Sequence, residues 1–172
     1  MRSLKDKINS LGSDVFLHNS IRISPIRDDY DLWYAVVECK LAAGQEDLVN
    51  PAGFSIGRAY LHPEGNIPCI IWNDDMRIGY IVLRKWNGGE ANSWSFYLSQ
   101  EHQGYGYGRT AAKLAVQILL AADPDTPIKL SAEAANHKAQ QLYLDLGFHR
   151  TDALDGEDLV FIYRKEFSND IP

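Results

Sequence analysis

The clearest pattern of hydrophobic positions lies in the second half of the chain. Ala111, Leu114, Ala115, Ile118 and Leu119 recur at helical spacing, which predicts an amphipathic helix over residues 107–122. Asp123-Pro124 ends this helix, because the residue before a proline disfavours helical backbone angles. Downstream, the pattern predicts a strand, a helix closed by Gly147 and a hairpin around Asp155-Gly156. These elements span residues 128–133, 136–146, 148–154 and 158–164.

The first half also alternates between short strands and helices. Apolar runs predict strands over residues 21–26, 67–73, 76–86 and 93–98. A helix over 30–42 begins at Asp28 or Asp29 as N-cap and places Leu32, Val36 and Cys39 on one face. A shorter helix is expected over 55–61, and residues 1–20 read as a short helix or a loosely attached extension. Strands and helices in this order, followed by a hairpin, indicate an α/β domain with a mixed central sheet.

Composition narrows the class of protein. With 172 residues, 45% hydrophobic and 23% charged, the chain fits one globular domain rather than two. Apolar runs are too short to cross a bilayer, and residues 1–20 carry charges, so we expect neither a membrane anchor nor a signal peptide. The net charge of −6 argues against nucleic acid as a partner. It slightly favours a cationic small molecule, although ordinary solubility charge explains it as well.

The cysteine and histidine positions predict no metal site. Cys39 and Cys69 form neither a disulfide framework nor a zinc pattern, and the histidines lack paired ligand spacing. Both cysteines are expected to be core thiols in a reducing cytoplasm.

A glycine-rich stretch before the long helix is the most informative part of the chain. It reads Gln103-Gly104-Tyr105-Gly106-Tyr107-Gly108-Arg109-Thr110. Glycines let the backbone approach an anion closely, and free amides at a helix start point toward that anion. This is a pyrophosphate cradle in physical terms, and a glycine-rich turn without a ligand is the alternative.

Two known phosphate-binding motifs fit this stretch poorly. A P-loop needs a lysine where Arg109 stands, and its spacing differs. A dinucleotide fingerprint is met by Gly106, Gly108 and Ala111, with Glu133 ending the next strand. That fingerprint starts directly at a strand end, whereas residues 99–104 intervene here. A nicotinamide-dependent oxidoreductase therefore remains a minor alternative.

A third motif, Q/R-x-x-G-x-G/A, is met by Gln103, Gly106 and Gly108. About thirty residues downstream stands a second pattern, made of Asn136, Ala139, Leu142, Tyr143 and Leu146-Gly147-Phe148. In this order the two motifs resemble the signature of the GNAT superfamily of N-acetyltransferases. The resemblance covers residues 21–165. It implies a mixed, mostly antiparallel, twisted central sheet, flanked by helices and splayed around the fourth and fifth strands. It also implies a domain over 21–167, an N-terminal extension over 1–20 and a C-terminal tail over 168–172.

The region upstream is loosely similar to the polyamine acetyltransferase branch of that family. Residues 45–51, Ser55-Ile56 and Ala59-Tyr60 are similar to its acceptor-side helices, and Ile78-Gly79-Tyr80 to its third strand. The resemblance implies transfer from acetyl-CoA to a primary amine, such as a polyamine or another small amine, by direct attack in a ternary complex. A protein N-terminus, a lysine or an antibiotic stays open as the acceptor, and the fold is compatible with a homodimer.

The resemblance also assigns roles to residues. Backbone amides of Gly104, Tyr105, Gly106, Tyr107, Gly108, Arg109 and Thr110 hold the coenzyme pyrophosphate, next to Gln103 of the motif. The strand ending at Tyr97 and Leu98 pairs with the pantetheine arm, and an amide near Leu98 polarises the thioester carbonyl. Asn136 contacts the coenzyme arm. Tyr143, two helical turns further on the same face, protonates the leaving thiolate.

A general base is missing from the expected place. The polyamine branch commonly carries an acidic residue on the fourth strand, but residues 93–96 read Ser-Trp-Ser-Phe. Glu133 has the best placement, with Glu38 and Glu46 as further candidates, and each also reads as a solvated carboxylate. This departure leaves an acyl-CoA-binding module with little catalysis as an alternative function.

Overall fold

The computed structural model describes residues 2–164, so the tail expected over 168–172 and the domain end at 167 lie outside the described residues. The helices are α1 (Leu4–Asn9), α2 (Asp29–Trp33), α3 (Ala52–Leu61), α4 (Tyr107–Ala122) and α5 (His137–Asp145), with short turns of other helix types at η1 (Ser13–Phe16), η2 (Tyr34–Glu38) and η3 (Gln100–His102). The strands are β1 (Leu17–His18), β2 (Ile21–Pro25), β3 (Asn66–Asn73), β4 (Met76–Lys85), β5 (Asn92–Leu98), β6 (Ile128–Ala132), β7 (His149–Asp155) and β8 (Asp158–Tyr163).

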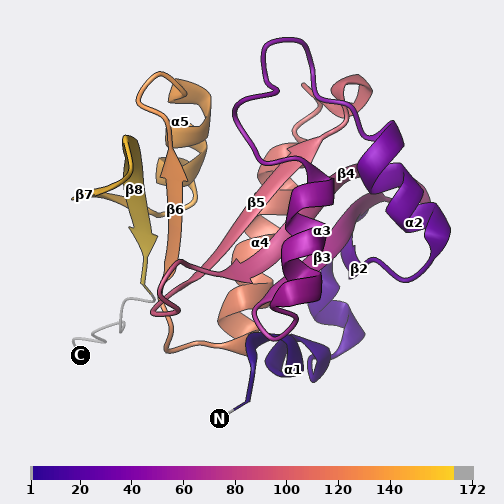
Figure 1. Cartoon of the computed structure of the whole chain (residues 1–172), viewed down its shortest axis with the longest axis horizontal. Coiled ribbons are helices and arrows are strands. Elements are labelled where there is room, and N and C mark those ends of the chain that lie inside the picture. Colours follow the sequence, from indigo (N-terminus) through magenta and orange to yellow (C-terminus); the bar gives the residue numbers. More distant parts are fainter. Residues whose placement is uncertain (1, 165–172) are drawn as a thin grey trace.

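Within the described residues these strands form one sheet in the order β1-β2-β3-β4-β5-β6-β8-β7. Neighbouring strands are antiparallel except β5 and β6, which run parallel and pair only at Asn92 and Ile128. Beyond that point the two strands diverge and leave a gap in the middle of the sheet (Figure 1). The expected mixed, mostly antiparallel sheet is confirmed. The strands predicted as fourth and fifth, over 93–98 and 128–133, correspond to β5 and β6. The numbers differ by one because the sequence analysis did not predict β1.

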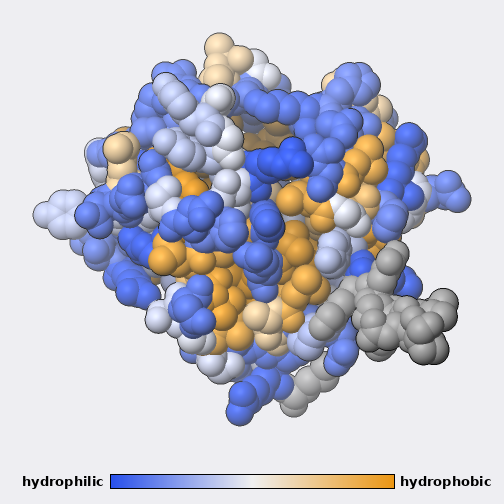
Figure 2. Space-filling model, turned by 180° about the vertical axis from the view of Figure 1, so that it is seen from behind, coloured by the Kyte–Doolittle hydropathy of each residue, from blue (hydrophilic) through white to orange (hydrophobic). Residues whose placement is uncertain are grey.

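Helices cover both faces of the sheet, and a core lies on each side (Figure 1). The larger core packs α4 and α1 against one face through Leu114, Ile118 and the buried side chains of the strands. The smaller core packs η2 and α3 against the other face around Ile70 and Tyr80. Seen from behind, on the side of the sheet that α4 covers, apolar residues gather in the middle of the surface among hydrophilic ones (Figure 2).

The N-terminal segment forms the short helix but is not loosely attached. Ser3 caps α1 through a reciprocal pair of hydrogen bonds with Asp6. Leu4 and Ile8 are 2% and 1% exposed and lie in the larger core. Two apolar residues four positions apart share one helix face, and this spacing in residues 1–20 was the signal for docking.

The helix expected over 30–42 is shorter and turns a different face inward. Asp28 caps it by accepting a hydrogen bond from the amide of Asp31 at 2.9 Å, but regular α geometry stops at Trp33. A π-helical turn follows over η2 and rotates the later side chains. Val36 is therefore exposed, while Tyr34 and Ala35 are buried beside Cys39. Leu32, in the regular turn before η2, is exposed as well.

Asp123 holds the closed end of the gap together. Its carboxylate accepts hydrogen bonds from Lys7 of α1 at 2.6 Å, Lys85 of β4 at 3.2 Å and Asn92 of β5 at 3.4 Å. Burial alone raises the pKa of Asp123, but the hydrogen bonds from Lys7, Thr126 and Lys85 outweigh it and hold the pKa at about 2. The acidic residue that ends α4 thus ties β4 and β5 to the N-terminal helix.

Candidate active site

The inner edge of β5 is open along most of its length. In an antiparallel pair, residues alternate between those bonded to the neighbouring strand and those whose backbone groups point away. Bonds from Trp86 to Ala91 and from Ser99 to Ile78 fix this alternation for β4 and β5. The N–H and C=O groups of Trp94 and Phe96 and the N–H of Leu98 therefore point into the gap toward β6. Since β6 pairs only at Asn92, these groups have no strand partner within residues 2–164.

The glycine-rich stretch stands at the open end of this edge. Gly106 is the N-cap of α4, with φ of 82° and no side-chain cap, so the amides of the first turn of α4 stay free. A Cβ built on Gly106 meets nothing within 4 Å. The loop therefore combines free amides, the positive end of a helix and open space for an anion.

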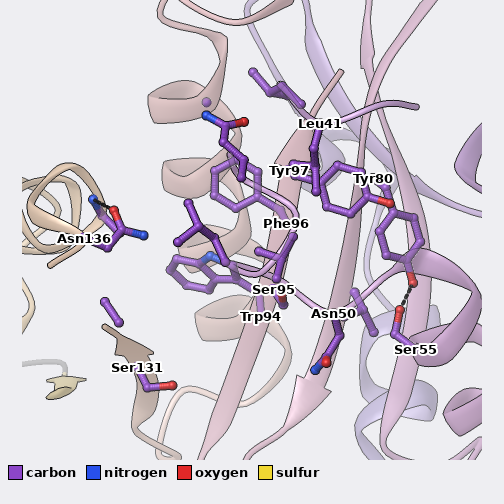
Figure 3. Close-up of a pocket in the computed structure, with 18 of the residues that line it drawn as sticks. Leu41, Asn50, Ser55, Tyr80, Trp94, Ser95, Phe96, Tyr97, Ser131 and Asn136 are labelled. Atoms are coloured by element: carbon purple, nitrogen blue, oxygen red, sulfur yellow. Dashed lines mark hydrogen bonds between the residues drawn. The ribbon is translucent and has the colours of Figure 1, made fainter. Parts of the chain in front are cut away.

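A cleft of about 970 Å³ runs from this loop along β5. One wall consists of α3 and the segment from Leu41 to Pro51, and the other of β6, α5 and the β7–β8 hairpin. Asn136 and Ser131 lie across the cleft from Tyr97, Tyr80 and Ser55 (Figure 3).

The side chain of Gln103 joins the end of β5 to the segment from Leu41 to Pro51. Its amide nitrogen donates to the Leu98 carbonyl at 3.0 Å and to the Gln45 side chain at 2.9 Å, and Gln45 donates back at 3.2 Å. Both donor hydrogens of Gln103 are thus used inside the protein. The glutamine of the motif fixes the end of β5 and ties the segment from Leu41 to Pro51 to the glycine loop.

Most of the expected coenzyme-binding residues line the cleft, and three do not. The lining includes Tyr97, Leu98, Gln103, Gly104, Gly106, Gly108, Arg109 and Asn136. Tyr105 and Tyr107 stack on each other with ring centroids 5.7 Å apart, and the Tyr107 hydroxyl accepts a hydrogen bond from Asn73 at 3.2 Å. Thr110 points back to the Gly106 carbonyl at 3.5 Å. Their side chains lie outside the lining, so only the backbone amides of Tyr105 and Tyr107 remain for an anion. The Thr110 amide does not, because it donates to the Gly106 carbonyl at 3.3 Å, and the expected role of Thr110 is wrong.

Tyr143 reaches the cleft from α5 with its ring held by other aromatic residues. The ring centroid lies 5.5 Å from Phe161 in an edge-on arrangement and 6.0 Å from Phe148. Its hydroxyl has no hydrogen-bond partner within residues 2–164. Burial, with the nearby negative charge of Asp158, raises the pKa of Tyr143 to about 12. The phenol therefore stays protonated at neutral pH and is free to donate.

Asn136 and Glu133 stand on the same wall as Tyr143. Asn136 caps α5 by accepting a hydrogen bond from the amide of Ala139 at 3.1 Å, so its side-chain nitrogen is left for the cleft. Glu133 is exposed at the end of β6 and also lines the cleft.

The acceptor-side wall contains polar residues to which the sequence analysis gave no binding role, although it placed Ser55 on an acceptor-side helix and Tyr80 in the third strand. Tyr80 of β4 and Ser55 of α3 share a hydrogen bond of 2.6 Å, and the Tyr80 ring tilts against Tyr97 with centroids 5.8 Å apart. Burial raises the pKa of Tyr97 to about 12, so it too remains a neutral phenol. Arg84 and Arg58 line the same cleft. Alternation along the strand over 76–86 was the signal that placed Tyr80 and Arg84 on one face.

Cys39 and Cys69 are both free and buried, as expected. Between residues 2 and 164 there is no group of three or more histidine, cysteine or acidic side chains arranged to hold a metal ion. The same part of the chain has no helix long and apolar enough to cross a membrane.

Comparison with known proteins agrees with this architecture. A model described as "Acetyltransferase (GNAT) family" matches residues 30–148. A search among curated protein sequences gives no match. An acetyltransferase from Agrobacterium tumefaciens str. C58 superposes with a TM-score of 0.68 at 17% identity, covering 87% of this chain and 94% of that one.

Two structures of an aminoglycoside acetyltransferase are similar to the same extent. One, in complex with coenzyme A, has a TM-score of 0.68 at 17% identity, over 85% of this chain and 95% of that one. The other, with paromomycin and acetyl-CoA, has a TM-score of 0.68 at 18% identity, over 86% and 94%.

The family match, on a sheet that splits beside an amide-rich loop, defines an acetyl-CoA-dependent acetyltransferase. More particularly, the chain belongs to the GNAT family of acetyltransferases.

Proposed function

We propose that this protein transfers the acetyl group of acetyl-CoA to a primary amine of a small molecule by direct attack. The observation that carries the proposal is the open edge of β5, which ends at the glycine loop and faces Tyr143 across one cleft. The polyamines that the sequence resemblance implies are one acceptor class to test. A homodimer remains a prediction.

The residues fit a coenzyme of this kind. The free amides of the first turn of α4 suit a pyrophosphate, and Gly106 leaves room for it. The unpaired groups of Trp94, Phe96 and Leu98 suit an amide-bearing arm that lies along β5 as an added strand. The side-chain nitrogen of Asn136 faces this arm from the other wall.

When bound, acetyl-CoA supplies an activated acetyl thioester. A backbone amide on the open edge of β5 that the arm leaves free donates to the carbonyl oxygen, where negative charge develops during transfer. The neutral amine of the acceptor bonds to the carbonyl carbon and the carbon–sulfur bond breaks. Tyr143 donates its phenolic proton to the departing thiolate and regains one from solvent, while Glu133 accepts the proton that the amine loses.

Release of CoA thiol from acetyl-CoA, measured with an amine panel, tests the reaction. The panel contains spermine, spermidine, putrescine, cadaverine, lysine, an aminoglycoside and a peptide. Acetyl-dependent thiol release with at least one amine supports the proposal. Tight acetyl-CoA binding without release for any amine would favour the acyl-CoA-binding module instead.

A pair of glycine variants tests the position of the coenzyme. Gly106 and Gly89 have φ of 82° and 80°, and a Cβ on either meets nothing within 4 Å. Alanine therefore costs similar backbone strain, about 1 kcal/mol, at both positions. Of these two glycines, Gly106 lines the cleft and Gly89 does not. We expect Gly106→Ala to weaken CoA binding at least tenfold in calorimetry and Gly89→Ala to leave it unchanged. Equal effects of the two variants would contradict the proposed site.

A further inference from the structure

We propose that the acceptor is an amine that also carries an anionic group, and that Arg84 and Arg58 bind this group on the floor of the cleft. The inference rests on the proposed acetyl transfer and names the class of acceptor. It separates amino-acid-like substrates from simple polyamines.

The floor of the acceptor side is set by the register of β4 and β5. Tyr80 pairs with Tyr97, Val82 with Ser95, and Arg84 with Ser93. Alternate residues of a strand share one face, so these six side chains lie on the face that α3 covers. Arg84 therefore stands one step closer to the closed end of the gap than Val82.

Arg84 is half-buried and lacks an anionic partner. Within the described residues its side chain makes one hydrogen bond, to the Lys85 carbonyl at 3.4 Å, and its guanidinium lies 5.8 Å from the centroid of the Trp86 ring. Within residues 2–164 no carboxylate lies within 4 Å of it, whereas Asp31 pairs with Arg77 and Asp145 with Arg109 at 2.9 and 2.8 Å.

The surroundings of Arg84 add positive charge. Burial, followed by the like charge of Arg58, lowers the pKa of Arg84, and Asp155 offsets this only in part. An arginine stays charged nevertheless, so the two guanidinium groups share one region of the cleft at a free-energy cost. A bound anion removes that cost.

A second, independent feature points to the same place. Ser93 is fully buried, lines the cleft beside Arg84, and its hydroxyl has no hydrogen-bond partner in the described part of the chain. Buried polar groups are nearly always paired, so the free hydroxyl of Ser93, on the strand beside Arg84, is a donor that a ligand bound to Arg84 can use. Guanidinium groups and a hydroxyl are all donors, and a carboxylate or phosphate accepts from all of them.

Acidic residues line the same cleft from other elements. Glu46 and Asp47 belong to the segment before α3, Glu133 to the end of β6, and Asp155 and Asp158 to the hairpin. Asp158 acts on the pKa of Tyr143, which places a negative charge near the proposed point of transfer. The cleft thus holds a carboxylate, Asp158, near the proposed point of transfer, and two arginines, partly offset by Asp155, at another place.

A diamino acid such as lysine or ornithine carries a side-chain amine for transfer and a carboxylate for the two arginines. A polyamine instead places a second ammonium beside Arg84 and Arg58, where like charges repel.

Lysine and cadaverine make a matched pair, because cadaverine is lysine without its carboxylate, and ornithine and putrescine make another. We expect the wild type to show kcat/KM values at least roughly tenfold higher for the amino acids, since a charged hydrogen bond supports that discrimination. Arg84→Gln removes most of this preference, chiefly through KM, and Arg58→Gln part of it. Arg150→Gln, on the exposed side of the β7–β8 hairpin, leaves it unchanged. A preference for phosphoethanolamine over ethanolamine, without one for lysine, identifies a phosphate as the anionic group.

Two failures can be told apart. Transfer to cadaverine and putrescine as efficient as to lysine and ornithine, with no gain for phosphoethanolamine, overturns the inference and leaves the acetyltransferase intact. Transfer to no amine contradicts the proposed function. In that case, calorimetry compares the affinities of lysine and cadaverine for the wild type saturated with CoA. Equal or undetectable binding of the two amines overturns the inference about the anionic group.

Discussion

Replacement of Tyr143 by phenylalanine tests the proposed chemistry most directly. The ring contacts with Phe148 and Phe161 remain, and the hydroxyl bonds to no described residue, so stability changes by less than about 0.5 kcal/mol. General-acid catalysis contributes roughly 10²- to 10⁴-fold. With the pKa of Tyr143 raised to about 12, the phenol is a weaker acid than a thiol of ~8.5. We therefore expect the lower end of the range, a fall in kcat of about 100-fold.

The assay is CoA thiol release at saturating acetyl-CoA and acceptor, measured across pH. Because Tyr143 keeps its proton to about pH 12, wild-type activity rises as the acceptor amine deprotonates and shows no alkaline fall below about pH 11. Tyr163→Phe is the matched control, since its ring also packs on Phe148, at 5.4 Å, but lies outside the cleft lining. Full kcat in Tyr143→Phe, or an equal loss in both variants, would refute the general-acid role.

Three further changes have outcomes set by the structure. Asp123→Asn lowers the free energy of unfolding by roughly 2 kcal/mol at pH 7, because the folded pKa of about 2 lies below the unfolded ~3.9; in urea titrations of the wild type, this contribution is complete above about pH 5 and fades as pH falls toward 2. Ile8→Ala costs about 2–4 kcal/mol in the same titration, since Ile8 is 1% exposed in the larger core, and a loss below 0.5 kcal/mol would show that α1 is dispensable. Gln45→Ala removes the hydrogen bonds between Gln45 and Gln103 and raises the acceptor KM about two- to tenfold with unchanged unfolding, so an unaltered KM would contradict a role for these bonds.

The sequence predicted those parts of the fold in which local pattern and tertiary packing agree. The helix over 107–122 was predicted with its observed bounds, because one continuous apolar face and a proline stop define it locally. The hairpin around Gly156 followed from its turn residues in the same way.

The prediction failed where contacts between distant parts of the chain determine the local conformation. The π-helical turn over η2 rotates Val36 outward and Tyr34 inward, and a 3.6-residue period does not foresee that extra residue in the turn. In the site, the motifs identified the loop and Tyr143 as candidates. The motifs did not indicate that the Gln103 side chain donates to Gln45 or that Arg84 lines the cleft. Both features arise where segments distant in the sequence come together in the fold.

The gap between β5 and β6 sets a limit on how stable this protein can become. Each backbone hydrogen bond that the gap withholds is worth about 0.5–1.5 kcal/mol to a closed sheet. A variant selected for thermal tolerance alone therefore gains most by pairing β6 with Trp94 and Phe96, and that same change would fill the place proposed for the coenzyme. If the proposed function is correct, the same few backbone groups of β5 can serve either the stability of the sheet or the binding of the coenzyme, and in this structure they are not paired with β6.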